Sequence, residues 1–366
     1  MRQLIFKSVI VMLISMAGNL SAQNFQKTAK YKEVFPLSEK IEVSIINKYG
    51  DVQIVHWDQD SVKVEVDIEV NSNKETKAEK LFAAIHVDFK SNFFYIVVET
   101  SLVGKSSLWT DISDKTKMIF NSSTTSRINY VVYIPSYAHL IVKNKYGNVY
   151  MGDYEGELSV DVSNGDFKAH VLTGKTKLKS SFGNIYVNRV DQLLLESANA
   201  EIEIEECKFL ETNTRSSKIY LDEVDELSLA SSHDKYHIGS LNSIHGNGNF
   251  TFLKIKQLNH QVDIKQKYGS LHFRHIDSEV DRFYLNTYKS DIHLSLSYEQ
   301  AYALDFRAIN PPIIQYPTGE YLKSEEIIDE EKGLKSVKIE WGGDGSGKVV
   351  PLNIQAEEGN IFINVK

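Results

Sequence analysis

The sequence predicts an all-β fold in which the chain winds into a β-solenoid (β-helix) with rungs of about 18 residues. Three observations carry this prediction: a short phrase that recurs through residues 138–296, apolar side chains that alternate with polar ones inside each copy, and turn residues at nearly constant spacing. Alternation with a period of two between turn residues is typical of strands and excludes amphipathic helices. The exception is one predicted helix near the N-terminus, which we expect to act as a cap.

The recurring phrase consists of a turn residue, a polar residue, and two apolar residues that flank a variable one. It is clearest at residues 147–151, 165–169 and 183–187. Nine turn residues mark the copies: Gly147, Gly165, Gly183, Ala200, Ser217, Asp234, Gly248, Gly269 and Ser290. They lie 18, 18, 17, 17, 17, 14, 21 and 21 residues apart, which gives a mean period of about 18.

One such repeat cannot fold alone. Burial of about five apolar side chains contributes roughly 2 kcal/mol each, whereas ordering the residues of a repeat costs about 1 to 2 kcal/mol per residue. Stacking at about 4.8 Å pairs the backbone of each rung with its neighbours and aligns inward side chains in columns. The first predicted column is Val149, Phe167, Ile185, Ile202, Ile219, Tyr236, Phe250, Leu271 and Ile292; the second is Met151, Ala169, Val187, Ile204, Leu221, Ile238, Phe252, Phe273 and Leu294.

The N-terminal residues 1–22 have the pattern of a secretory signal peptide. Arg2 and Lys7 precede a short apolar run, and Ala22 ends a group of small residues suited to cleavage. The apolar run is too short for a convincing membrane span. We therefore expect an exported protein of the periplasm, cell surface or extracellular space, with no transmembrane segment in the mature chain.

Residues 23–37 are predicted to be a polar lead-in, and residues 38–137 a first rung followed by a cap and an insertion. The first rung is expected at residues 41–54, where the Lys-Tyr-Gly sequence at Lys48 matches later copies at Lys145 and Lys267. Residues 74–85 are predicted to form a helix with Asn73 as its N-cap, because their apolar positions share one helical face. A Ser/Thr-rich insertion spans residues 101–126.

Beyond the regular repeats of residues 138–296, the period loosens over residues 297–366. The acidic stretch 325–331 is predicted to be a solvated loop, and residues 337–341 a strand. The glycine-rich residues 342–347 occur once, so a hairpin is favoured over a calcium-binding repeat. The phrase returns at residues 359–363, which we expect to form a final rung at the far end.

Composition limits the possible partners and cofactors. The 366-residue chain has 41 basic and 49 acidic residues, a net charge of −8. Removal of Arg2 and Lys7 leaves 39 basic residues and a net charge of −10, which argues against binding of nucleic acid. Cys207 is the single cysteine, so no internal disulfide is possible. We interpret it as a small residue at a turn. No motif for a cofactor, phosphate loop or zinc site is present.

These features together resemble a known family. Asn47 to Ile54 with the following Trp57, the Tyr-Ile-Pro at residues 133–135, the Lys-Tyr-Gly-Asn-Val at 145–149, and the Gly-Asn-Ile at 359–361 resemble the β-solenoid domains called putative adhesins, common in exported proteins of Bacteroidota. The resemblance covers nearly all of residues 38–366. It implies the fold and a surface role, and it brings no catalytic residues.

One outward-facing column is the candidate ligand-binding surface. It lies between the two inward columns and reads Tyr150, Lys168, Tyr186, Glu203, Tyr220, His237, Thr251, His272 and His293. Its rings, Tyr150, Tyr186, Tyr220, His237, His272 and His293, suggest either a surface for glycan or protein, with the tyrosines about 10 Å apart on alternate rungs, or exposed strand positions filled by residues with high β-propensity. His272 and His293 on neighbouring rungs also suggest a shared metal ion, the less favoured interpretation.

Three functions remain open from the sequence. The favoured one is a non-catalytic exported cell-envelope or surface protein, an adhesin or scaffold that binds glycan or an envelope protein through its faces. A carbohydrate-active β-helix enzyme, a lyase or hydrolase, would need an acidic cluster, whereas turn preference explains the Asp and Asn residues after the turns. A regulatory protein that senses the state of the envelope is the third.

Overall fold

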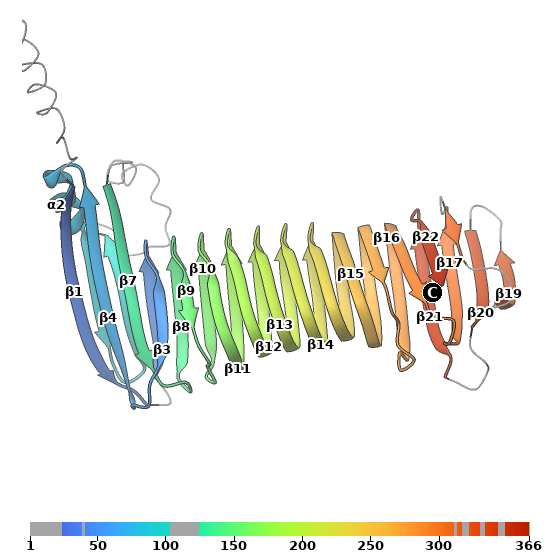
Figure 1. Ribbon diagram of the computed structural model, residues 1–366, viewed down its shortest axis with the longest axis horizontal. Coiled ribbons are helices and arrows are strands. Elements are labelled where there is room, and N and C mark those ends of the chain that lie inside the picture. Colours follow the sequence, from blue (N-terminus) through green and yellow to red (C-terminus); the bar gives the residue numbers. More distant parts are fainter. Residues whose placement is uncertain are drawn as a thin grey trace, which may run out of the picture.

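The protein is almost entirely β-structure. The computed structural model describes residues 24–38, 41–102, 124–310, 313–316, 322–329, 334–342 and 348–365. Within these ranges all strands belong to one long sheet, and the one helix lies at the N-terminal end (Figure 1). The predicted signal peptide, most of the Ser/Thr-rich insertion and most of the glycine-rich turn lie outside the described residues.

The central strands stack in parallel, and from β10 to β16 each strand pairs with the one that follows it in the chain. From β11 to β15, residues pair with partners 17 or 18 positions further on; Ile185, for example, opposes Ile202. A register shift between Leu172 and Lys175 accounts for the change from 18 to 17. The strands are β8 (His139–Lys145), β9 (Val149–Met151), β10 (Leu158–Ser163), β11 (Phe167–Ser181), β12 (Asn184–Ala198), β13 (Glu201–Arg215), β14 (Lys218–Ser232), β15 (Lys235–Phe273) and β16 (Arg282–Leu296).

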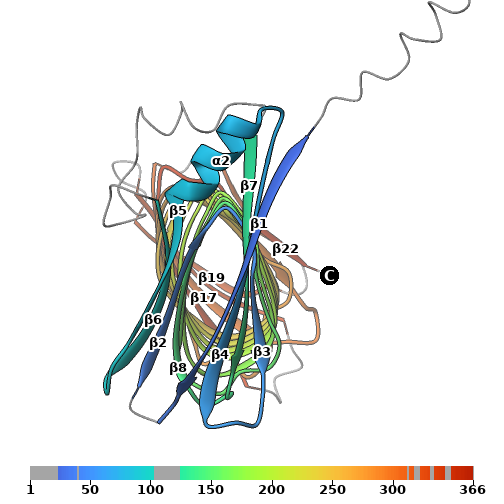
Figure 2. The ribbon, with the colours of Figure 1, turned by 90° about the vertical axis from the view of Figure 1, so that its left-hand side faces the viewer.

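Each repeat contributes to two opposed walls. β9 pairs with the first part of β11, and β10 pairs with its second part, so a long strand such as β11 passes through both. Figure 2, which looks along the long axis, shows the two walls facing each other. We call the wall that contains β9 the first wall and the wall that contains β10 the second wall. Their inward side chains form the apolar core.

The first inward column agrees with the prediction through six repeats. Val149, Phe167, Ile185, Ile202, Ile219 and Tyr236 are paired in succession, and none is more than 1% exposed. The hydroxyl group of Tyr236, the one polar atom in the predicted columns, lies 2.7 Å from the Thr214 hydroxyl in the core. Leu271, Ile292 and Ile361 continue the alignment further along the sheet.

The predicted register is wrong for the next repeat. Phe250 and Phe252 are 42% and 51% exposed, whereas Thr251 and Leu253 are buried. The corner falls at Phe250, whose φ is 52°, and not at Gly248. Because side chains alternate along a strand, this change of register turns both predicted inward residues of this repeat outward. Phe250 stacks between His233 and Tyr268, at centroid distances of 4.7 and 4.4 Å, which covers part of the exposed ring.

A polar ladder runs along the corner before the first wall. The Asp166 Oδ1 atom accepts a hydrogen bond from the Asn184 backbone N–H at 2.9 Å, and the Asn148 Oδ1 atom accepts one from Asp166 N–H at the same distance. Asp51 Oδ1 does the same for Asn148 N–H at 2.8 Å. Each side chain thus satisfies a donor of the next repeat, which gives the Asp and Asn residues after the turns a structural role.

The N-terminal residues form a strand where the sequence suggested a lead-in. β1 (Phe25–Pro36) pairs antiparallel with β4 (Ser61–Ser72). Its polar composition suits this edge position, because charged side chains oppose further strand pairing. β2 (Glu42–Lys48) and β3 (Val52–His56) pair in parallel with β8 and β9.

The helix α2 (Glu75–Ala84) packs against β1, β4 and β5 at the N-terminal end of the molecule (Figures 1 and 2). Its N-cap is Lys74 and not Asn73, and no side chain caps it; the Lys74 backbone N–H donates to Ser72 Oγ at 3.2 Å. Ala78 and Leu81 form its buried face. The other strands of this end are β5 (Ile85–Ser91), β6 (Tyr95–Leu102) and β7 (Thr124–Ile134).

The C-terminal part departs from two expectations. Residues 322–329, part of which was expected to be a loop, form β19 antiparallel to β20 (Leu334–Trp341). The last two strands, β21 (Val350–Glu357) and β22 (Ile361–Val365), pair with β16 and lie between it and β17 (Tyr302–Ile309) and β18 (Ile314–Gln315). The final repeat of the sequence therefore does not close the far end, where β20 and β19 follow β17 (Figure 1).

Candidate functional site

The predicted outward column runs along the first wall. Tyr150 opposes Lys168, which opposes Tyr186; Glu203, Tyr220 and His237 follow in successive repeats. The backbone alternation that buries the inward columns turns these six side chains outward. The structure thus brings Tyr150, Tyr186, Tyr220 and His237 onto one line.

Lys254, and not Thr251, continues this column after His237. Phe252 N–H donates to Asp234 O in the same pattern in which Lys235 N–H donates to Ser217 O, so Phe252 opposes Lys235 and Lys254 opposes His237. Arg274 N–H donates to Ile255 O, which likewise places His272 opposite Lys254. His293 and Phe362 complete the column.

The rings in the column stack on one another. His272 and His293 have centroids 4.1 Å apart and planes 6° from parallel, and His293 stacks on Phe362 at 4.8 Å. Tyr220 and His237 stack at 5.2 Å, and the Lys168 ammonium lies 4.9 Å from the Tyr186 ring centroid. Because neighbouring groups cover these faces, a ligand on the wall would meet ring edges. Imidazole edges carry nitrogen atoms, so the chemistry they offer is hydrogen bonding and charge.

The three histidines are less basic than free imidazole. The pKa of His237 is lowered by burial and then by Lys254 and Lys235. Burial also lowers the pKa of His272, with further lowering by His293, Lys254 and Arg274 against an opposing effect of Asp291. The pKa of His293 is lowered by burial and partly restored by Asp291. These rings are therefore held toward the neutral form, in which each has one donor and one acceptor nitrogen.

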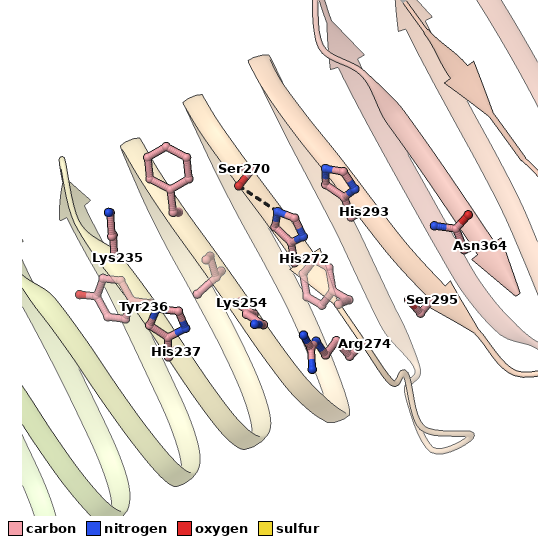
Figure 3. A pocket seen from close by; sticks show the side chains of 13 residues that line it. Lys235, Tyr236, His237, Lys254, Ser270, His272, Arg274, His293, Ser295 and Asn364 are labelled. Carbon is pink, nitrogen blue, oxygen red and sulfur yellow. Dashed lines mark hydrogen bonds between the residues drawn. The ribbon is translucent and has the colours of Figure 1, made fainter. Parts of the chain in front are cut away.

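A hollow of about 740 Å³ lies over the histidine end of the column (Figure 3). Lys235, His237, Lys254, His272, Arg274 and His293 line it, together with polar groups such as Ser270 and Asn364. The Ser270 hydroxyl lies 3.1 Å from His272 Nε2. We call Lys235, His237, Lys254, Lys256, His272, Arg274 and His293 the basic strip.

The four cationic side chains of this strip were missed by the sequence prediction. Lys254 and Lys256 take outward positions once Phe252 is placed opposite Lys235, and Arg274 opposes Lys256 in the next repeat. The signal was present in the sequence as an alternation of Lys254 and Lys256 with buried Leu253 and Ile255. The wrong register at Gly248 concealed it.

Two side chains of a type that can act in catalysis or metal binding, Asp234 and Cys207, are buried in the core. Asp234 is fully buried, and its carboxylate accepts hydrogen bonds from the Thr214 and Ser231 hydroxyls, both at 2.7 Å. Cys207 is buried on β13; burial, with smaller contributions from Asp191 and Asp225, raises its thiol pKa to about 12. Among the described residues no three His, Cys, Asp or Glu side chains are grouped to hold a metal ion.

Comparisons with known proteins identify no family. No protein-family model and no curated protein matches the chain. Within the described ranges, no helix has the length and apolar character to cross a lipid bilayer.

Three solved structures are weakly similar. A "putative cell adhesion protein" from Clostridium sporogenes aligns with 11% identity over 93% of this chain and 100% of its own, with a TM-score of 0.19. A "putative lipid binding protein" from Parabacteroides distasonis aligns with 11% identity over 70% and 96%, with a TM-score of 0.27. A "putative adhesin" from Bacteroides fragilis aligns with 8% identity over 92% and 97%, with a TM-score of 0.23. Such TM-scores establish neither a shared fold nor a shared function.

Proposed function

We propose that the chain is an exported, non-catalytic binding protein of the cell envelope or surface, in which stacked rungs form a β-solenoid and the first wall carries the ligand. The observation that supports the binding role is the continuous outward column from Tyr150 to Phe362, in which rings and charged side chains follow one another in register. A repeat scaffold presents such a column as a long surface suited to an extended ligand such as a glycan chain.

The β-solenoid is supported by the pairing of the central strands. From β9 to β15, the chain returns to the same position after 17 or 18 residues, and the inward side chains align. The two opposed walls supply both sides of the core. Stacking of this kind leaves an extended surface that does not depend on any single loop.

A non-catalytic role is supported by the structural use of three carboxylates, those of Asp51, Asp166 and Asp234. Asp51 and Asp166 accept backbone hydrogen bonds across repeats, and Asp234 has its oxygen atoms saturated inside the core. A general acid or nucleophile needs an oxygen atom that faces the substrate. Export is supported by the signal-peptide pattern of residues 1–22.

A glycan-array screen of the purified protein tests the binding role. We expect one class of glycan to bind to the wild-type protein and to be lost in the variant Tyr150→Ser, Tyr186→Ser, Tyr220→Ser, with the thermal unfolding midpoint little changed. Tyr284→Ser, which alters a ring on the second wall, is the control and should bind normally. Unchanged binding by the triple variant would remove the tyrosine-bearing repeats of the first wall from the proposal, and cleavage of the bound glycan would favour the lyase or hydrolase alternative.

A further inference from the structure

We propose that the basic strip binds a linear acidic polysaccharide, one with carboxylate groups repeated along its chain, which lies along the long axis of the molecule. This inference rests on the proposed function and specifies its ligand. It starts from the distribution of charge on the first wall.

The cations of the strip lie on three consecutive repeats. Lys235 is on the first, Lys254 and Lys256 are on the second, and Arg274 is on the third. Successive repeats are separated by about 4.8 Å, so positive charge recurs along the axis at short intervals. A polymer with one carboxylate on each sugar matches such a line of charges when it runs parallel to the axis.

No acidic residue shares the outward face of the first wall in the three repeats that carry these cations. The outward residues of the first wall in these three repeats lie within 235–239, 252–256 and 270–274, and none of these segments contains Asp or Glu. Among the described residues, Lys235, Lys254, Lys256 and Arg274 form no ion pair within 4.0 Å. Four unpaired cations on a protein of net charge −8 form a local site of opposite sign.

The middle of the same wall has the opposite charge. Asp166, Glu201, Glu203, Glu205 and Asp222 lie at outward positions of the preceding repeats. There Lys218 is paired with Glu201 at 3.7 Å, in contrast to the free cations of the strip. An anionic ligand is therefore attracted to one part of the wall and repelled from the next, which sets where it binds.

The neutral groups of the hollow favour a polysaccharide over other polyanions. Imidazole edges, the Ser270 hydroxyl and the Asn364 amide are hydrogen-bonding groups that suit sugar hydroxyls. These hydrogen-bonding groups line a hollow, into which a single sugar chain fits better than the flat surface of a bilayer. Duplex DNA carries one charge per about 1.7 Å, a density that the neighbouring acidic repeats would strongly repel.

Binding of the full-length purified protein to polygalacturonate tests the inference, with methyl-esterified polygalacturonate of the same length as the neutral probe. We expect isothermal titration to show binding of the acid form alone, weakened by added salt. Lys254→Glu, Lys256→Glu should weaken it at least about tenfold. The matched control is Lys265→Glu, Lys267→Glu, which makes the same charge change at the same spacing on β15 but on the second wall, and it should bind within about twofold of wild type.

Three results would overturn the inference. One is equal binding of the esterified and acid forms, and another is equal loss in the two lysine variants. The third is binding to phosphatidylglycerol vesicles with no binding to polygalacturonate, which would assign the strip to a membrane surface. If a neutral glycan binds and depends on Tyr150, Tyr186 and Tyr220, the proposed function stands while this inference fails. If no glycan binds at all, both fail.

Discussion

The imidazole rings of His272 and His293 lie face to face, with centroids 4.1 Å apart and planes 6° from parallel. They come from neighbouring repeats, and Lys254 and Arg274 face His272 from the same wall, with Asp291 as the acidic group nearby. Protonation of both rings would set two positive charges against each other. The stack is therefore compatible with the neutral state that the lowered pKa values describe.

We expect acid to destabilise the protein through these two histidines. Their folded pKa values lie below that of free imidazole, so as the pH falls the unfolded chain takes up protons first. The contribution of the two neutral histidines to the free energy of unfolding is then fully present above about pH 6.5. It is lost as the pH falls through the folded pKa values. Thermal unfolding midpoints measured from pH 8 to pH 5 should fall less steeply in His272→Gln, His293→Gln than in wild type. The control His245→Gln, on the second wall, should keep the wild-type slope.

The corner glycines should tolerate no side chain. A methyl group at Gly165 would lie 2.0 Å from the Gly147 carbonyl oxygen in the preceding repeat. We expect Gly165→Ala to lower the free energy of unfolding by about 2 to 4 kcal/mol, because the backbone of two repeats must separate. Gly152→Ala is the control, since a methyl group there has nothing within 4 Å. Urea unfolding of both variants measures the difference, and equal midpoints would contradict it.

The buried Asp234 should contribute strongly to the free energy of unfolding, because it holds together repeats whose turn residue is not glycine. Its carboxylate accepts hydrogen bonds from the Ser217 and Ser232 backbone N–H groups and from the Thr214 and Ser231 hydroxyls. Asp234→Ala removes the acceptor of these four hydrogen bonds, including that of the buried Ser217 N–H, and we expect a loss of about 3 kcal/mol or more in unfolding free energy. The exposed Asp222→Ala should change stability by less than about 0.5 kcal/mol. A small loss in Asp234→Ala would show that water replaces the carboxylate.

The sequence predicted the inward columns because their evidence is local. The alternation of apolar and polar residues places the side chains of Val149, Ile185 and Ile219 inward. The nearly constant spacing of the repeats determines which residues lie next to one another in the stack. The outward column followed from the same two facts. The positive charge of the outward column could not be predicted in the same way, because the outward position of Lys254 depends on the corner at Phe250.

That corner was not predictable from turn chemistry. Gly248 and Asn249 match the recurring phrase, and Phe250 is a poor residue for a positive φ. The alternative register gains contacts between residues distant in the chain, since Thr251 reaches the Ser231 hydroxyl at 2.8 Å and Phe250 stacks on His233. The insertion of β21 and β22 beside β16 was missed for a similar reason: pairing of strands so far apart leaves no periodic trace in the sequence.

Cys207 should be unreactive in the folded protein. Its side chain is 4% exposed, opposite Val190 and Val224 of the adjoining repeats, and burial raises the thiol pKa to about 12. Alkylation proceeds through the thiolate, so at pH 8 the folded protein should react with iodoacetamide far more slowly than an unfolded control in urea. Mass spectrometry of timed samples measures both rates. Modification at the rate of the unfolded chain would mean that β13 opens readily, and the apolar ladder through Val190, Cys207 and Val224 would then not be the continuous core described above.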